Sequence, residues 1–225
     1  MSVATTSPPP AWKVNEELWR CVACGASLVG TSESLECRAC GKRYPIRDGV
    51  VVIKDDFTAN NGVVRDYYNG PLWPKFRFWE WVTFLFQGGE KRARNMILRH
   101  LPQGSELRLL DVAIGDGVYL PWLPPQWEIV GIDISTVQLD ACRRRAGERP
   151  LPLVLGEAEE LPFQDRQFDA VLSIGGFNYF NDPEGSLREM ARVTRPGGTI
   201  VVADEVPNLS DQMKLGRLLG FEKFD

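Results

Sequence analysis

The stretch Asp111-Val-Ala-Ile-Gly-Asp-Gly117 decides the fold, because an apolar run leads straight into an acid and a glycine-rich turn. About 20 residues later, Val130-Gly-Ile-Asp-Ile-Ser135 ends a second apolar run with another acid. Glycines let a backbone approach a ligand closely. Ligands of open parallel sheets lie beyond the carboxyl ends of the strands. One binding site is therefore expected where four residues converge: Asp111, Gly115, Gly117 and Asp133.

The rest of this region alternates short apolar runs with amphipathic segments. The runs predict strands over 107–112, 128–133, 151–155, 168–173 and 199–204. Helices are expected over 137–146 and 184–194, the second stopped by Pro196-Gly197-Gly198, and a helix that begins at 119–123 is broken by Pro124-Pro125. Alternating strands and helices predict an α/β protein with a Rossmann-like parallel sheet.

Four of the five cysteines form two matched pairs, Cys21-x2-Cys24 and Cys37-x2-Cys40, which are separated by 12 residues and are each followed by glycine. Four thiolates on two tight turns can surround one Zn²⁺ tetrahedrally, with no ligand position left open for catalysis. The alternatives are two disulfides, which a reduced compartment disfavours, and a redox CxxC, which needs only one pair. The fifth, Cys142, is expected to pack as a small apolar side chain.

Residues 19–54 resemble a known zinc-binding family. After the second cysteine pair comes Tyr44-Pro-Ile-Arg-Asp-Gly49, which is similar to the pattern of the Trm112-like zinc ribbons. The resemblance implies a structural or partner-binding role for the metal, since this family supports methyltransferases, often as a separate subunit.

Two further motifs follow the glycine-rich turn, Gly156-Glu-Ala-Glu-Glu-Leu-Pro-Phe163 and Glu189-Met-Ala-Arg-Val-Thr-Arg-Pro-Gly-Gly198. With the first two they resemble class I S-adenosylmethionine-dependent methyltransferases of the ubiquinone/menaquinone type ("methyltransferase 11"), over about residues 90–205. The resemblance implies that Asp111, Ala113 and the Gly115–Gly117 backbone line the methionine end of the cofactor. Asp133 would hold the ribose, Ile134 would pack on adenine, and Glu157 and the Ala158 amide would bind adenine. Ser173 and Gly175 would face the amino-acid portion.

The chain departs from this family pattern at two positions. Ala113 replaces the usual first glycine of the loop, and Glu157 replaces the more usual aspartate. The second change keeps the carboxylate acceptor and lengthens its reach.

Catalytic residues carry no comparable motif. The single histidine, His100, is expected at a helix end on the surface. The polar candidates near the expected pocket are Tyr67, Tyr68, Asn178, Tyr179, Asp204 and Glu205. The segment 72–86 carries seven aromatics in 15 residues, and is interpreted either as helices that cover the cofactor or as an apolar substrate pocket or membrane-surface contact.

Composition limits the remaining choices. The formal net charge of -4 disfavours a nucleic-acid-binding surface, and neither a secretory signal nor a transmembrane segment is predicted, so a cytoplasmic location is expected. The expected organisation is a flexible tail (1–18), a zinc ribbon (19–54), a helical aromatic-rich lid or linker (55–103) and a cofactor-binding Rossmann-like domain (104–225).

The family sheet has seven strands, but the sequence supplies about five, so C-terminal strands are expected to be missing. The fifth strand would then be an exposed edge, covered by a partner chain, by a second copy, or by another part of this chain such as residues 50–53. The leading hypothesis is a methyltransferase for a small aromatic or apolar metabolite. The alternatives are an RNA base methyltransferase and a non-catalytic scaffold whose zinc domain recruits a partner.

Overall fold

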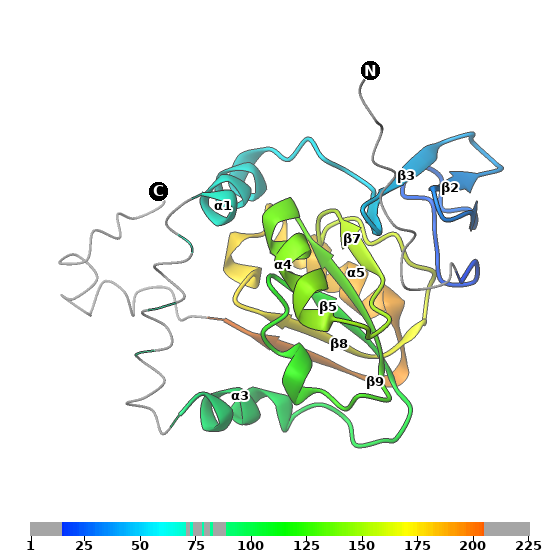
Figure 1. The fold of residues 1–225 in the computed structure, drawn as a ribbon. Coiled ribbons are helices and arrows are strands. Elements are labelled where there is room, and N and C mark those ends of the chain that lie inside the picture. The colour runs from blue at the N-terminus through cyan, green and yellow to red at the C-terminus, as the bar shows by residue number, and fades with distance from the viewer. Residues whose placement is uncertain (1–14, 71–72, 74–77, 79–81, 83–88, 205–225) are drawn as a thin grey trace.

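The computed structural model describes residues 15–70, 73, 78, 82 and 89–204 (Figure 1). The N-terminal residues 1–14, most of the aromatic segment 72–86, Glu205 and the rest of the C-terminal segment lie outside the described residues. Leu18, expected in the tail, is buried in the core.

A single nine-stranded sheet runs through the described chain, in the order β1-β2-β3-β4-β7-β6-β5-β8-β9. The first four strands are β1 (Leu28–Gly30), β2 (Ser34–Cys37), β3 (Arg43–Arg47) and β4 (Val50–Val52). The others are β5 (Arg108–Val112), β6 (Glu128–Asp133), β7 (Leu153–Leu155), β8 (Phe168–Ile174) and β9 (Thr194–Ala203). Strands β4 to β9 run parallel to one another, whereas the pairs β1–β2, β2–β3 and β3–β4 are antiparallel. The predicted Rossmann-like parallel sheet is confirmed.

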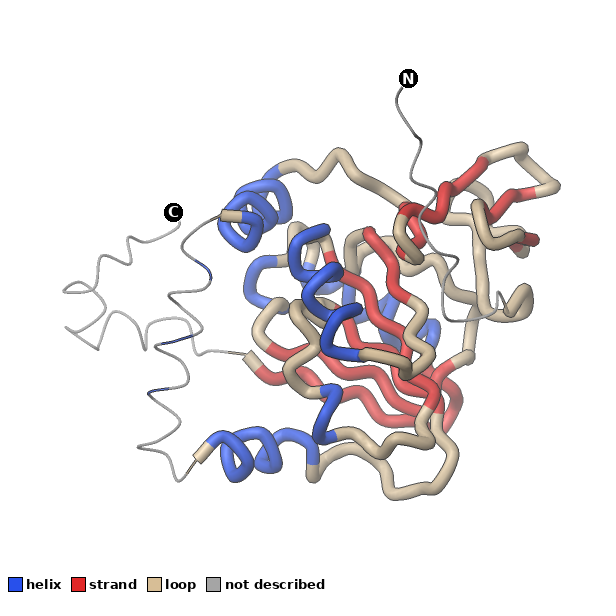
Figure 2. Tube along the Cα trace, in the orientation of Figure 1, coloured by secondary structure: helices blue, strands red, loops and turns tan. Residues whose placement is uncertain are grey.

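Helices cover both faces of the parallel part, as Figure 2 shows. The helices are α1 (Ala59–Asn69), α3 (Glu90–Leu98), α4 (Thr136–Ala146) and α5 (Pro183–Val193). Neighbouring residues of β5 point to opposite faces, so Leu109 joins Leu139 and Cys142 of α4 in one core, and Leu110 joins Met190 of α5 in the other. Apolar strands buried on both faces explain why their sequences are continuous apolar runs.

Two predicted elements differ in detail. The residues after Tyr119 form only a 3-10 turn, η1 (Leu120–Trp122), because Pro121 and the prolines that follow cannot continue a helix. Strand β9 begins directly after α5, and pairing jumps from Thr194 opposite Phe168 to Thr199 opposite Ala170. The Pro-Gly-Gly turn is therefore looped out inside the strand.

The prediction that residues 50–53 cover the edge of the last strand is wrong. Strand β4 pairs with β7, at the opposite side of the sheet, with Val51 opposite Val154. Its position follows from β3, because the chain turns at Asp48-Gly49 and pairs β4 with β3. This pairing holds β4 beside the parallel strands of the sheet. Within the described chain β9 has one paired neighbour, β8. A partner or second copy at that edge stays a prediction.

The N-terminal segment forms a second link between the cysteine-bearing strands and the main sheet. Trp19 is fully buried and packs on Phe163, with ring centroids 5.5 Å apart, and Phe163 packs edge-on against Phe168. The backbone supports this contact, since the Gln164 N–H donates to the Leu18 carbonyl at 2.9 Å. Both parts of the chain therefore share one core.

Replacing Trp19 by alanine should test this shared core. We expect Trp19→Ala to lower the free energy of unfolding by about 3–5 kcal/mol, because it opens a cavity against Phe163. Urea unfolding followed by far-UV circular dichroism would measure the change. Val63→Ala, at a side chain exposed on α1, is the control and should change stability by less than about 0.5 kcal/mol. Equal effects of the two substitutions would contradict a shared core.

Candidate functional site

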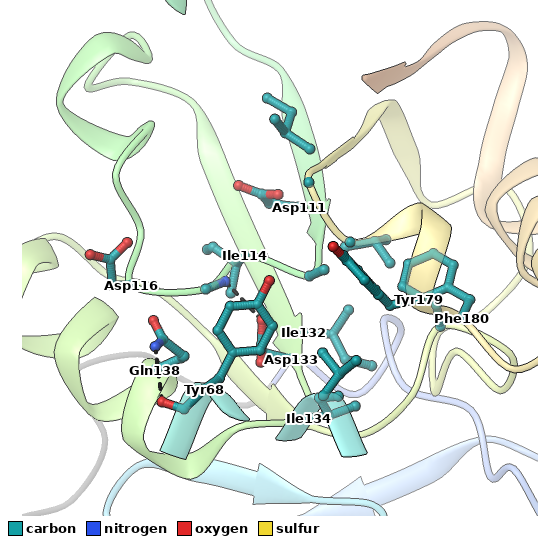
Figure 3. Close-up of a pocket in the computed structure, with 18 of the residues that line it drawn as sticks. Tyr68, Asp111, Ile114, Asp116, Ile132, Asp133, Ile134, Gln138, Tyr179 and Phe180 are labelled. Atoms are coloured by element: carbon teal, nitrogen blue, oxygen red, sulfur yellow. Dashed lines mark hydrogen bonds between the residues drawn. The ribbon is translucent and has the colours of Figure 1, made fainter. Parts of the chain in front are cut away.

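A pocket opens at the carboxyl ends of β5, β6, β7 and β8, where the parallel sheet was expected to bind a ligand (Figure 3). Helices α1 and α3 lie beside this end of the sheet (Figure 2). The pocket is lined by many of the residues predicted from the sequence: Asp111, Ala113, Gly115, Asp133, Ile134, Ala158, Gly175, Tyr68, Tyr179 and Asp204.

Other predicted residues lie behind this lining. Gly117 packs under the loop, Ser173 is fully buried within β8, and Glu157 is held by side chains from other elements. Tyr67 stacks edge-on against Tyr68. These residues can support the pocket wall but do not form its surface.

Two further candidates, Asn178 and His100, are not part of the pocket lining. Asn178 uses its N–H to donate to the Asp204 carboxylate at 2.8 Å, which ties the end of β9 to η2 (Phe177–Tyr179). His100 is exposed after α3 and next to Arg99, as expected. The pocket lining therefore contains no histidine.

Asp133, the last residue of β6, is the best-defined polar group of the pocket. Its Oδ2 accepts the Gly115 N–H at 2.8 Å and its Oδ1 accepts the Ser135 N–H at 2.9 Å. Burial raises its pKa to about 6, although the N–H groups of Ser135 and Gly115 oppose the shift. Each oxygen retains a lone pair, so the carboxylate can accept one hydroxyl proton on each side.

Asp111 lies deeper, in β5, and its side chain also faces the pocket (Figure 3). Burial raises the pKa of Asp111 to about 8, and the negative charge of Asp133 adds to the shift. A cationic ligand beside these two buried carboxyls would oppose the rise of their pKa values and favour their ionised forms.

The loop that joins β5 to the pocket has a left-handed backbone. Ala113 has φ of 62°, a conformation that favours glycine, which explains why the family pattern has glycine there. The Ala113 methyl group fits because the residue that faces it, Gly176, has no side chain. A Cβ at Gly176 would lie 2.5 Å from the Ala113 Cβ. The substitution is thus compensated locally, at the cost of backbone strain.

Gly117 is required for a different reason. A Cβ there would lie 2.7 Å from both the Cys142 Sγ and a Leu120 methyl. Cys142 is fully buried on α4, and burial raises the pKa of its thiol. This residue therefore packs against the loop as an apolar side chain.

Helix α1 forms one wall of the pocket and is fastened to the β6–α4 turn. The Ser135 hydroxyl caps α4 by accepting the Gln138 N–H at 3.1 Å, and it donates to the Asn69 Oδ1 at 2.6 Å. Gln138 Nε2 reaches the Tyr68 carbonyl at 3.5 Å (Figure 3). Tyr68 is held over the pocket as a result, and burial raises the pKa of its phenol.

Trp73, which lines the pocket, belongs to the aromatic segment that was interpreted as a cover of the cofactor or an apolar substrate pocket. Other lining residues were missed by the sequence analysis: Asn61, Arg94, Tyr119 and Phe180. They come from helices and turns whose spacing to the strand motifs is not fixed by any local pattern. Arg94 is the most informative, because its guanidinium is buried on α3 beside Glu90 and 4.6 Å from the centre of the Tyr119 ring. The signal available in sequence was an arginine among the apolar positions of an amphipathic segment.

The four cysteines of the N-terminal region form a candidate metal centre. Their Sγ atoms all lie within 4.8 Å of one another, with Cys21 to Cys40 at 3.7 Å and Cys24 to Cys37 at 3.4 Å. None of the five cysteines forms a disulfide. A Zn–S distance of about 2.3 Å requires tetrahedral ligands to be about 3.8 Å apart, so the cluster fits a four-thiolate metal site.

Both cysteine turns have the same backbone. The N–H of the glycine after each pair donates to the carbonyl of the first cysteine at 2.8 Å, Gly25 to Cys21 and Gly41 to Cys37. Both glycines have positive φ. The Tyr44 hydroxyl lies 3.2 Å from the Cys21 Sγ, which gives that thiolate an additional donor. The N-terminal region thus fits a small zinc ribbon.

The fold and the pocket together define a class of protein. A parallel sheet with the order β7-β6-β5-β8-β9, a glycine loop after β5 and an acid at the end of β6 is the arrangement of class I methyltransferases. Residues 110–202 match the family profile described as a methyltransferase domain. The match covers less than half of the chain and coincides with the strands and loops that form the pocket.

Known proteins resemble the chain over the same region. The chain is 36% identical over 121 residues to a demethylmenaquinone methyltransferase of Renibacterium salmoninarum, which covers 53% of this chain and 50% of that protein. It is 35% identical over 103 residues to a fatty-acid O-methyltransferase of Mycolicibacterium smegmatis, covering 44% and 38%. The chain thus spans half or less of the length of these curated relatives.

A solved structure supports the fold. A SAM-dependent methyltransferase of Thermotoga maritima superposes with a TM-score of 0.51, covering 71% of this chain and 67% of that one, at 21% identity. Among the described residues, no helix has both the length and the apolar character needed to cross a membrane.

The substitution Asp111→Asn should reduce the pH dependence of the free energy of unfolding. Between the ordinary pKa of 3.8 and the folded pKa of about 8, the folded state keeps a proton that the unfolded state has released, so stability falls as pH rises through this window. We expect Asp111→Asn to flatten that fall and to be more stable than the parent at pH 8.5.

Urea unfolding of both proteins at pH 5, 7 and 8.5 would measure how the free energy of unfolding changes with pH. Asp140→Asn, at a residue that is partly exposed on α4 and paired with arginines, is the control. An unchanged pH dependence in Asp111→Asn would contradict the assignment.

Proposed function

We propose that this chain is an S-adenosylmethionine-dependent methyltransferase that acts on a small aromatic or apolar acceptor. The observation that carries the proposal is Asp133, whose two oxygens are fixed by the Gly115 and Ser135 N–H groups at the mouth of the pocket. A carboxylate in this position can accept both hydroxyls of a ribose. The methyltransferase domain at residues 110–202 supports the same conclusion.

The pocket residues fit the chemical groups of this cofactor. Asp133 would hold the ribose, and Ile134 and Ala158, which line the pocket beside it, would contact the base. Asp111 would attract the cationic methionine end. Arg94 lines the same pocket with a buried guanidinium and would pair with the carboxylate of that end.

S-adenosylmethionine supplies an activated methyl group on a sulfonium, which an acceptor displaces in line. Catalysis then depends largely on alignment of the reactants and exclusion of water. Tyr68 and Tyr179 would provide polar contacts at this point, and their rings would bound the acceptor. Because burial raises the pKa of Tyr68, its phenol would stay protonated and act as a donor.

The residues of the pocket lining support this acceptor class. Five aromatic side chains belong to the lining: Tyr68, Trp73, Tyr119, Tyr179 and Phe180. Flat apolar molecules pack well against such surfaces. The names of the curated relatives, a demethylmenaquinone methyltransferase and a fatty-acid O-methyltransferase, agree with an apolar acceptor. The net charge of -4 makes RNA the less favoured substrate.

The cysteine cluster would hold one structural Zn²⁺. With four thiolates it has no open position, so the ion would stabilise the ribbon and would not enter the reaction. Through β4 and Trp19 the ribbon contacts the main sheet, and the metal would therefore support the whole chain.

Calorimetric titration of the zinc-loaded protein with S-adenosylhomocysteine tests the cofactor site. Because Asp133→Ala removes a charged acceptor for two hydroxyls, we expect the Kd to rise by at least about 100-fold. Asp140→Ala, on the exposed face of α4, should bind as the parent does. A parent protein that binds no cofactor would refute the enzyme proposal and favour the scaffold hypothesis.

Metal analysis tests the second site. We expect one zinc per chain, lost in Cys24→Ser because three thiolates bind more weakly than four. Removal of the metal with a chelator should lower the thermal midpoint. Cys142→Ser keeps all four ligands and should retain full zinc. A protein with no zinc, or one whose midpoint is insensitive to chelation, would contradict a structural metal.

A further inference from the structure

Asn61 is a buried polar residue of the pocket lining. It lies on α1, is only 2% exposed and contributes to the pocket lining. Its Nδ2 donates to the Glu157 Oε2 at 3.0 Å, and Glu157 lies just beyond the end of β7. Asn61 is thus fixed where the ends of β6 and β7 adjoin.

The orientation of the Asn61 amide is set by the charges around it. Besides Glu157, both oxygens of Glu159 lie 3.4 Å from Nδ2. Ionised carboxylates only accept hydrogen bonds, so the NH₂ group must face them. The amide is planar, and Oδ1 therefore points away from the two acids. Asn61 offers the pocket an acceptor.

Both oxygens of Glu157 are engaged by the protein in this arrangement. Its Oε2 is bound by Asn61, and its Oε1 forms an ion pair with Lys54, two residues after β4. The hydrogen bond that Lys54 donates to Glu157 raises the pKa of Lys54, so the lysine stays charged. Glu157 is largely buried and does not line the pocket.

The position of a bound base follows from the ribose site. Asp133 and Gly156 are neighbours, because the Gly156 N–H donates to the Asp133 carbonyl at 3.0 Å. Gly156 and Ala158 both line the pocket. A base attached to a ribose at Asp133 would therefore extend toward the end of β7, where Asn61 lies.

We propose that Asn61 reads the exocyclic amino group of adenine through its Oδ1, and that the Lys54–Glu157 pair fixes the amide in that orientation. The assignment rests on the proposed function. Adenine presents an N–H donor at this position. Hypoxanthine presents a carbonyl there, which would oppose the Asn61 carbonyl with no donor between them.

The test compares two ligands that differ only at this group, S-adenosylhomocysteine and S-inosylhomocysteine, titrated into the full zinc-loaded chain by calorimetry. The parent protein should prefer the adenosyl ligand by about 10- to 100-fold, because the inosyl ligand leaves a buried carbonyl unpaired. In Asn61→Leu the ratio of the two Kd values should fall close to 1, because the adenosyl ligand loses affinity. Asn60→Leu, the adjacent exposed residue on α1, is the matched control and should keep the ratio.

A second variant tests the orientation. The side-chain amide introduced by Glu157→Gln can donate as well as accept, so the Asn61 amide is no longer forced into one orientation and its NH₂ can face the ligand. We expect the preference for the adenosyl over the inosyl ligand to fall several-fold, because the inosyl ligand binds more tightly. Adding Asn61→Leu to Glu157→Gln should abolish that gain, since the donor comes from Asn61. A gain that persists in the double variant would show that residue 157 contacts the base itself and would overturn the assignment.

The outcomes distinguish a failure of the role of Asn61 from a failure of the proposed function. A parent that binds both ligands equally, or an Asn61→Leu protein that melts like the parent and keeps the full preference, would overturn the role of Asn61 alone. A parent that binds neither ligand would overturn the proposed function, and this assignment with it.

Discussion

The parallel pairing of β4 with β7 is the interaction on which the rest of the structure depends. Three residues on each strand are in register, from Val50 opposite Leu153 to Val52 opposite Leu155. The pairing makes the cysteine-bearing strands an extension of the main sheet, and it directs the chain after β4 toward the carboxyl end of β7. Lys54 and α1 follow from there, so the ribbon positions one wall of the pocket.

The two buried carboxyls of the pocket lower the stability of the free protein. Burial raises the pKa of Asp111 and of Asp133, which costs free energy in the free protein at neutral pH. Ala113 adds backbone strain at the same loop. Such costs are typical of binding sites, where groups are held ready for a ligand. The surrounding strands compensate, because they are buried on both faces.

The main elements could be predicted well from the sequence, since parallel strands are continuous apolar runs and the motif acids lie at their ends. Asp111, Gly115 and Asp133 do converge on one pocket. Local patterns could not predict that β4 would join β7, because a three-residue strand carries no signal for its partner. The same limit applies to Asn61 and Arg94, which reach the pocket only through tertiary packing. Glu157 was expected to bind adenine by resemblance, and this stays a prediction; the sequence could not show that Lys54 and Asn61 also contact its oxygens.

The most direct test of the account is a map of amide hydrogen exchange with and without S-adenosylhomocysteine on the zinc-loaded protein. If the pocket binds this ligand, exchange should slow together at the loop after β5, at the β6–α4 turn around Ser135 and at residues 156–158, while β1 to β3 remain unchanged. Slowed exchange confined to other segments, or no change at saturating ligand, would contradict a cofactor site at the carboxyl ends of these strands.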